Sequence, residues 1–248
     1  ENQPRKDDFR PEVHDSDGLM VATGEGEWLW RPLQNPRQVL VTSFATTNPK
    51  GFGLMQRDRQ WSSYEDVEAR YERRPSAWVR PLHPWGPGRV ELVQLPTPDE
   101  THDNVVAYWV PQQLPAPGTP LEVSYELAWQ GDEQQRPPSA WATQSRKGVG
   151  YTQQSAEALR TQVQYVVDFT GPALHDLKAD APVKAVVTSD ANGRVLESGV
   201  YRNPATGQWR MTLRVERLRK DQPIELRAFL QHLQHAVSET WTHVILPE

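Results

Sequence analysis

Hydrophobic and polar positions alternate along most of the chain in the short runs that are typical of β-strands. Residues 89–95 read RVELVQL, which places Val90 and Leu92 on one face of a strand. Nine further runs are rich in β-branched and aromatic residues and are bounded by turn-forming residues: 37–44, 104–110, 121–129, 162–169, 183–190, 194–202, 208–216, 224–231 and 238–246. The pattern predicts an all-β fold.

Helical periodicity is weak by comparison. Residues 64–75 read YEDVEARYERRP, a charged stretch that Pro75 stops, and they fit either a short helix or a long surface loop. Residues 155–162 fit a single helical turn. The 22 prolines are hard to place in long helices and easy to place at strand ends. We therefore expect fewer than about a quarter of the residues to be helical, below the average of about 30–35%.

A polar, proline-rich stretch divides the chain. Residues 131–140 read GDEQQRPPSA and show no periodicity, which is typical of a linker. We expect a first domain over 1–131, a linker over 132–137 and a second domain over 138–248. Six short strands after the linker, with turn signals between them, favour an immunoglobulin-like sandwich. Asn192-Gly193 predicts a hairpin turn there.

Composition excludes several classes of protein. The chain has 248 residues and a net charge of −5, so no basic excess points to nucleic acid. No run reaches the roughly 18 apolar residues of a membrane span. There is no cysteine, and the close pair His232 and His235 has no carboxylate beside it in the sequence. We expect no metal and no cofactor.

Tryptophan is abundant, with ten residues in the chain and seven of them before residue 132. Two interpretations stay open. The side chains fill a β-rich core, or their flat faces stack on sugar rings, since tryptophan combines a large apolar face with a polar group.

Carboxylates cluster in three segments of the first domain: HDSDG at 14–18, QRDR at 56–59 and PDETHDN at 98–104. Loops above a rigid sheet often hold functional groups, and a pair of carboxyl groups is what glycosidic bond cleavage requires. The alternatives are structural: a turn cap in the first segment, an ion pair around Asp58 in the second and a solvated loop in the third.

Longer motifs carry a resemblance to a known family. The chain resembles the periplasmic glucan biosynthesis proteins G and D, and specifically the C-terminal half of such a protein. The matching segments are RPEVHDSDGL (10–19), GEWLWRPLQNP (26–36), NPKGFGLMQRDR (48–59), RYERRPSAWV (70–79), WGPGRVELVQLPTPDETHDNVVAYWVP (85–111) and SETW (238–241). The similarity covers the whole chain and is densest over residues 10–131.

The resemblance implies a fold, a location and a substrate. It implies part of a galactose-mutarotase-like β-sandwich followed by an immunoglobulin-like (E-set) sandwich. It implies a periplasmic protein that makes osmoregulated glucans with a β-1,2-linked backbone. Some members of the family are inverting hydrolases of β-1,2-glucan, and related members are transglycosylases.

The resemblance also implies catalytic residues. The general acid of an E-T-x-D-N motif falls on Asp103, and the general base of an H-D-S-D motif falls on Asp15, which can act through a substrate hydroxyl. An acid must hold its proton near neutral pH. Asp99, Glu100 and the apolar strand after Asp103 favour the neutral acid, whereas His14 and Arg10 suit a charged base. We expect a glucan cleft lined by Trp28, Arg57, Arg59, Trp61 and Trp85.

An alternative function stays open. The QRDR segment is similar to the G-type proteins, so the protein is either a glucanase or transglycosylase or a non-catalytic glucan-binding scaffold in glucan assembly. The expected partners are β-1,2-glucan and a missing N-terminal part of the same protein. Without that part we expect this chain to be inactive.

Overall fold

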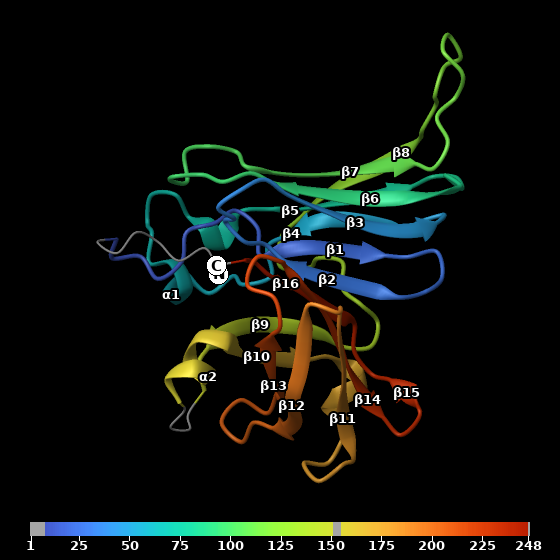
Figure 1. The fold of residues 1–248 in the computed structure, drawn as a ribbon. Coiled ribbons are helices and arrows are strands. Elements are labelled where there is room, and N and C mark those ends of the chain that lie inside the picture. The colour runs from blue at the N-terminus through green and yellow to red at the C-terminus, as the bar shows by residue number, and fades with distance from the viewer. Residues whose placement is uncertain (1–7, 151–154, 248) are drawn as a thin grey trace. The chain divides into compact units, whose positions relative to one another are not determined.

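A computed structural model describes residues 8–150 and 155–247 (Figure 1). Strands make up 47% of the structure and helices 7%. The predictions of an all-β sandwich protein and of scarce helix are therefore confirmed. Among the described residues, none of the helices has both the length and the apolar character that crossing a membrane requires.

The chain divides into two compact units, Glu1–Gln135 and Arg136–Glu248. The point of division lies inside the segment 132–137 that the sequence predicts as a linker. The assignments of the first unit to a galactose-mutarotase-like sandwich and of the second to an immunoglobulin-like one rest on the resemblance and stay predictions.

The first unit contains two antiparallel sheets. Its strands follow the order β2-β1-β4-β5-β8 in one sheet and β3-β6-β7 in the other. The strands are β1 Gly18–Ala22, β2 Trp28–Pro32, β3 Leu40–Thr47, β4 Gly51–Met55, β5 Ser76–Pro81, β6 Pro87–Gln94, β7 Val105–Pro111 and β8 Tyr125–Gln130. Helix α1 spans Trp61–Tyr64, and the 3₁₀ helix η1 spans Tyr71–Arg73.

A buried apolar cluster lies between these two sheets. It is formed by alternate residues of β1, β2 and β4 and by the residue just past β2 on one side, and by residues of β3 and β6 on the other. Its members are Leu19, Val21, Leu29, Leu33, Phe44, Phe52, Val90 and Leu92. This cluster fixes the strand registers, because a shift by one residue would turn every side chain of a strand to the opposite face.

Strand β1 shows why the alternation of the sequence misses four strands of this unit, β1, β2, β4 and β5. All five of its residues are buried. Leu19 and Val21 face the apolar cluster, and Met20 faces the other side, where its sulfur accepts a hydrogen bond from Arg57 (3.2 Å). A strand buried on both faces has no alternation of polar and apolar residues to detect.

The segment 64–75 is neither one helix nor a plain loop. Helix α1 ends at its first residue and η1 forms near its end. Between them Glu65 (φ 52°) and Arg70 (φ 51°) take left-handed backbone conformations, which a helix cannot continue through.

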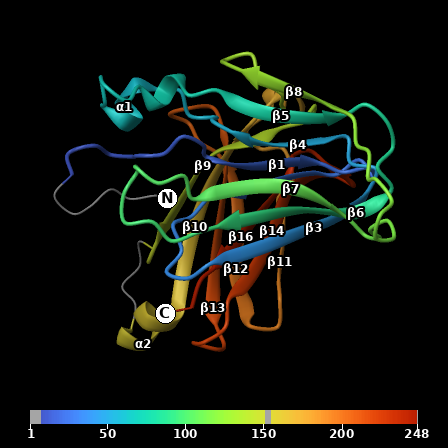
Figure 2. The ribbon, with the colours of Figure 1, turned by 90° about the horizontal axis from the view of Figure 1, so that it is seen from above.

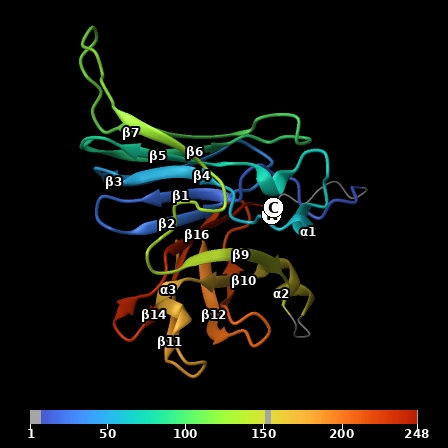
Figure 3. The ribbon, with the colours of Figure 1, turned by 180° about the vertical axis from the view of Figure 1, so that it is seen from behind.

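The second unit also contains two sheets (Figures 1 and 3). One has the order β12-β13-β10-β9, and the other has the order β11-β14-β16, with β15 paired to β14. The strands are β9 Trp141–Gly148, β10 Gln162–Thr170, β11 Val183–Ser189, β12 Gly193–Arg202, β13 Trp209–Arg217, β14 Ile224–His232, β15 His235–Ala236 and β16 Thr240–Ile245. Helices α2 and α3 span Ala156–Thr161 and Pro172–His175.

The core of the second unit follows from strict alternation in β10, β13 and β14. The buried apolar side chains of these strands are Tyr165, Val167, Phe169, Trp209, Met211, Leu213, Val215, Ile224, Leu226, Ala228 and Leu230. The ring of Tyr165 lies 5.6 Å from that of Trp241 on β16, so the two sheets meet face to face. Sequence alternation predicts the first and last residues of β10 to β14 to within two residues, because each strand buries one face only.

The predicted hairpin at Asn192-Gly193 is wrong. The turn is tight, but β11 and β12 belong to different sheets. Asn192 Nδ2 donates to the carbonyl of Pro223 (2.9 Å), and Asp190 Oδ2 accepts from the N–H of Glu225 (3.2 Å). These bonds tie the turn to the start of β14, so β11 pairs with β14 instead of β12.

A buried carboxylate joins three strands of the second unit. Asp168 on β10 accepts hydrogen bonds from Arg210 Nε and Nη2 (both 2.7 Å) and from Arg146 Nη1 (2.8 Å). Burial acts to raise the pKa of Asp168, but the hydrogen bonds from Arg210 and Arg146 outweigh it, so the pKa lies below its ordinary value of 3.8.

We predict that Asp168→Asn lowers the free energy of unfolding by about 2 kcal/mol near neutral pH, since it weakens hydrogen bonds between charged groups. Because the native pKa of Asp168 is lowered, its stabilising effect is full above the unfolded pKa and is lost as pH falls through the native pKa. Denaturant unfolding at several pH values measures both effects. The control is Glu197→Gln, which breaks a pair between the exposed carboxylate of Glu197 and Arg214 and should cost less than about 1 kcal/mol. Equal losses in the two variants would contradict the prediction.

Candidate active site

Three loops of the first unit meet at one end of its strands. The N–H of Asp17, just before β1, donates to the carbonyl of Met55 at the end of β4 (2.9 Å). The N–H of Gln34, just past β2, donates to Gln94 Oε1 at the end of β6 (2.7 Å). Figures 1 and 2 show the segment before β1, helix α1 and the loop between β6 and β7 at this same end.

Asp15 lies in the segment before β1 and is exposed, with its carboxylate 3.2 Å from Arg74 Nε. The residue that carries the positive charge beside Asp15 is not one of the two that the sequence suggested, His14 and Arg10. His14 contacts Glu12 instead, and Arg10 binds other carboxylates. Asp15 therefore keeps a cationic neighbour, Arg74, which directly follows η1 and does not belong to the segment of Asp15.

Asp103 lies in the loop between β6 and β7 and is exposed. The base of the loop is closed by hydrogen bonds in both directions between Leu95 and Asn104. Asp99 folds the tip by accepting from the N–H of Thr101 (3.0 Å). From the sequence we expected the apolar strand after Asp103 to shield it from solvent. This is wrong for the part of the chain that the structure describes, because Asp103 is exposed and β7 begins only at Val105.

Arg10 connects the two motif segments. Its Nη2 donates to Glu100 Oε1 (2.9 Å), and Glu100 begins the E-T-H-D-N motif that contains Asp103. Its Nη1 donates to Asp66 Oδ2 (2.9 Å), and its Nε and Nη2 donate to Asp8. The pKa of Arg10 is raised, first by the hydrogen bond to Asp8, so the guanidinium stays charged.

A second charged cluster is formed by residues on both sides of Asp15 in the sequence: Glu12, His14 and Asp17. His14 Nε2 is 2.9 Å from Glu12 Oε2 and 3.6 Å from Asp17 Oδ1. Burial acts to lower the pKa of His14, but the Glu12 hydrogen bond and the charge of Asp17 outweigh it and the pKa is raised. Burial raises the pKa of Asp17 above its ordinary value, although His14 and two backbone N–H groups act against it.

Asp17 also joins its segment to the QRDR segment. Its Oδ2 accepts the backbone N–H of Arg57 and that of Asp58, the latter at 2.7 Å. The structural alternative that sequence analysis gave for the HDSDG segment was a local turn cap. The carboxylate instead caps a loop forty residues away, a contact that only the pairing of β1 with β4 brings about.

The two arginines of QRDR are held by the protein itself. The Arg57 guanidinium lies over the Trp30 ring, 3.5 Å from its centroid. Arg59 is largely buried and donates to the carbonyls of Glu72 (3.2 Å) and Gln130 (3.3 Å). These contacts give both arginines a structural role, and their contact with glucan stays a prediction.

The three tryptophans predicted for the cleft lie at both ends of the strands. Trp61 opens α1 at the end that holds Asp15 and is 47% exposed. Trp28 pairs with Ala22 at the opposite end of β1, where its ring stacks on that of Trp78 at 6.0 Å. Trp85 precedes β6 at that opposite end too. The structure thus brings only Trp61 of the three to the end of the two aspartates.

Gln56 is a residue that sequence reasoning missed. It is fully buried, and its Nε2 donates to Tyr64 Oη (2.9 Å) and to the carbonyl of Tyr71 (3.1 Å). The backbone carbonyl of Gln56 accepts from Gln134 Nε2 (2.8 Å). This network fixes the chain that carries Arg57 and Arg59. An uncharged amide at the start of the QRDR segment gives no signal in sequence, because its partners come from other segments of the chain.

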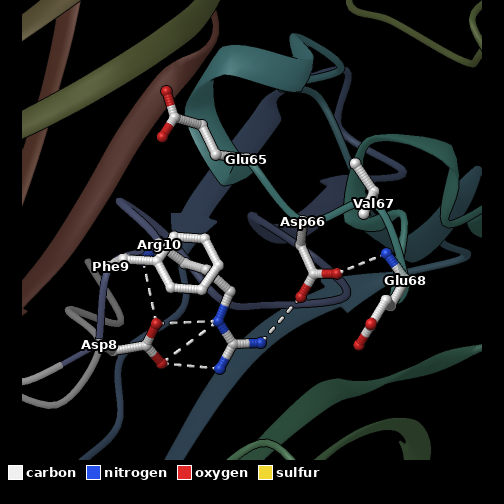
Figure 4. A pocket seen from close by; sticks show the side chains of 7 residues that line it. All are labelled: Asp8, Phe9, Arg10, Glu65, Asp66, Val67 and Glu68. Carbon is white, nitrogen blue, oxygen red and sulfur yellow. Dashed lines mark hydrogen bonds and ion pairs between the residues drawn. The ribbon is translucent and has the colours of Figure 1, made fainter.

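An open pocket of about 520 Å³ borders the Arg10 network (Figure 4). In Figure 4 the Arg10 guanidinium lies between the carboxylates of Asp8 and Asp66, and the Phe9 ring overlaps the aliphatic part of the Arg10 side chain. The lining residues are Asp8, Phe9, Arg10, Glu65, Asp66, Val67 and Glu68. Exposed apolar side chains beside charged ones give the pocket mixed character.

Glu12, His14 and Asp17 offer ligand atoms within 4.8 Å of one another, which is a spacing that a metal ion can use. Sequence analysis predicted no metal and named only His232 and His235 as a close pair of histidines, so it did not single out this group. His14 and Asp17 hydrogen bond within the protein, however, so the group is accounted for as a structural cluster.

Comparison with known proteins adds an identification to this geometry. A family model described as "Periplasmic glucan biosynthesis protein, MdoG" matches residues 1–245. The chain belongs to this family. The family predicted from the motifs is thereby confirmed, and its description names the periplasm.

Relatives in the MdoG family are close. The chain is 53% identical over 250 residues to the glucans biosynthesis protein G of Ralstonia nicotianae, covering 100% of this chain and 50% of that protein. It is 48% identical over 249 residues to the protein of the same name from Pseudomonas paraeruginosa, covering 98% of this chain and 47% of that protein. The chain spans about half the length of the curated relatives it matches.

We predict that Asp17→Asn speeds hydrogen exchange at the backbone N–H groups of Arg57 and Asp58 by about 10-fold, since a charged acceptor contributes about 1.4 kcal/mol or more. Hydrogen exchange read by NMR measures this. Asp15→Asn is the matched control, because Asp15 lies in the same motif but its carboxylate is exposed and pairs with Arg74. Unchanged exchange in Asp17→Asn would show that the carboxylate does not hold the loop.

Proposed function

We propose that the chain carries the acid–base part of a periplasmic protein that acts on β-1,2-linked glucan, as an inverting glucanase or a transglycosylase. In this proposal Asp103 is the general acid and Asp15 is the general base. One observation carries it: both aspartates are exposed at one end of the first unit, and Arg10 bridges their segments through Glu100. Membership of the MdoG family supports the glucan as substrate class.

The chemistry needs two carboxyl groups on opposite sides of a glycosidic bond. In direct inversion they stand roughly 6.5–9.5 Å apart with a water between base and sugar, and a relay through a substrate hydroxyl allows a longer separation. Asp103 would protonate the departing oxygen, and Asp15 would remove the proton from the attacking water, directly or through that hydroxyl. Arg74 beside Asp15 favours its charged form, as a base requires.

An N-terminal part of the same protein is the proposed partner of this chain. Tyr125, Leu127 and Trp129 on β8 are paired in register with Pro81, Val79 and Ala77 of β5. Val79 packs on the apolar cluster, so the three β8 side chains lie on the inward face of their sheet, yet Trp129 is 67% exposed. A sheet of three strands cannot cover one of five. We propose that further strands cover β8, and that without them the chain is inactive.

We predict that Asp103→Asn in the full-length protein abolishes cleavage of linear β-1,2-glucan and leaves glucan binding nearly intact, because it removes the proton donor and little volume. A reducing-end assay and a calorimetric titration with a β-1,2-linked oligosaccharide measure the two properties. The control is Asp176→Asn, an exposed carboxylate of the second unit.

Cleavage at the parent rate by Asp103→Asn would refute the assignment of Asp103. Binding without cleavage in the parent protein would favour the alternative function, a non-catalytic glucan-binding scaffold in glucan assembly.

We predict that Trp61→Ala weakens glucan binding by about 5-fold, corresponding to the roughly 1 kcal/mol of one aromatic contact. Trp61→Phe should keep most of the affinity, since it keeps a flat apolar face. Tyr201→Ala on β12 is the control, because it removes an exposed aromatic ring of the second unit. Equal affinity in parent and Trp61→Ala, measured by calorimetric titration, would remove Trp61 from the glucan site.

A further inference from the structure

We propose that Arg10 is a positioning residue that sets the place of the proposed general acid by holding the loop that carries it. The inference rests on the proposed function. Arg10 lies five residues before Asp15 and binds Glu100, three residues before Asp103. It therefore links the segment of the proposed base to the loop of the proposed acid.

Two carboxylates outside the β6–β7 loop, those of Asp8 and Asp66, hold the Arg10 side chain in place. Asp8 accepts from its Nε (3.0 Å) and Nη2 (2.7 Å), a paired geometry that orients the guanidinium plane. Asp66 accepts from its Nη1 (2.9 Å). Asp66 is itself held by the backbone N–H groups of Glu68 (2.9 Å) and Ala69 (2.7 Å). The guanidinium is thus a fixed point, because two carboxylates from different segments hold it.

Glu100 is the partner that can move. The β6–β7 loop is tied to the sheet at its base by Leu95 and Asn104, and by Thr97, whose N–H donates to Asn35 Oδ1 (3.0 Å). Its tip is in solvent, and there Glu100 Oε1 accepts from Arg10 Nη2. Removing this bond leaves the closure of the loop at Leu95 and Asn104 unchanged and frees the turn around Glu100, which leads into Asp103.

The expected effect is on rate more than on stability. An ion pair at the surface contributes little to folding, about 0–1 kcal/mol. Catalysis is more sensitive, because a misplacement of about 1 Å of a reacting group can cost roughly 10²-fold in rate. Loss of the Arg10–Glu100 bond should lower kcat by 10-fold to 10²-fold and change KM little, since Asp103 acts in the transition state and not in ground-state binding.

The test uses the full-length protein, in which this chain is joined to the N-terminal part proposed above. Hydrogen exchange by mass spectrometry is measured over residues 95–104 in the parent, Arg10→Met, Glu100→Gln and the double variant. Glu100→Gln is the safer variant for folding, because Glu100 is more exposed than Arg10. Exchange should rise in all three variants, and to the same level.

Arg80→Met and Glu126→Gln are the matched controls. They break an Arg–Glu pair of 2.6 Å that joins β5 and β8 away from the site. Neither should change exchange over 95–104 or kcat. On β-1,2-glucan, the double variant of Arg10 and Glu100 should be no slower than either single variant, because both remove one and the same link.

Three outcomes would overturn the inference. Unchanged exchange over 95–104 in both single variants would show that the link does not hold the loop. A lower kcat without faster exchange would mean that Arg10 acts on the substrate and not through the loop. Faster exchange with an unchanged kcat would show that the loop position does not matter for the reaction. A parent protein without any cleavage would refute the proposed function, and the exchange result would still decide whether Arg10 holds the loop.

Discussion

Strand β1 pairs with β4 in an antiparallel register that runs from Gly18 opposite Met55 to Ala22 opposite Gly51, and the site depends on this pairing. It sets the segment before β1 beside the segment after β4, so the HDSD and QRDR motifs become neighbours. The register is held by burial of Leu19 and Val21, since a slip of one residue would turn both out of the core. Core packing therefore decides where the charged groups lie.

Carboxylates close together in the sequence have opposite physical roles at this end of the sandwich. Asp17 is largely buried and serves as an acceptor for two backbone N–H groups, a role that burial makes strong and that leaves no freedom for chemistry. Asp15, two residues earlier, is exposed beside one arginine and is available to a substrate. Solvent access, rather than residue type, separates the structural carboxylate from the candidate base. Asp99 and Asp103 differ by their hydrogen bonds instead, since Asp99 accepts from the N–H of Thr101 and so folds the loop that presents Asp103.

The tryptophans divide between both interpretations that their abundance suggested. Trp30, Trp78, Trp209 and Trp241 are buried, which is the core role. The backbone makes room for such rings: a Cβ on Gly51 would lie 2.3 Å from the ring of Trp78. Trp61 and Trp129 are exposed, on the helix beside the candidate site and on the uncovered strand β8. Among the tryptophans named here, only Trp61 and Trp129 are therefore exposed enough to stack on a sugar. For Trp129 there is a simpler explanation, because it lies on the apolar face of its own sheet.

The sequence by itself determined the all-β class, the strands that bury one face, and the family, whose motifs are long and contiguous. Those strands include β10, β13 and β14, where one residue in two faces a core and leaves a period of two. Tertiary structure alone decided the rest. It revealed β1, whose two buried faces show no period, and it sent Asn192-Gly193 into a turn between sheets. It also joined Arg10 to Glu100 and Asp17 to Asp58. Each of these depends on which distant segments meet, and a local pattern holds no information about a contact partner forty or ninety residues away.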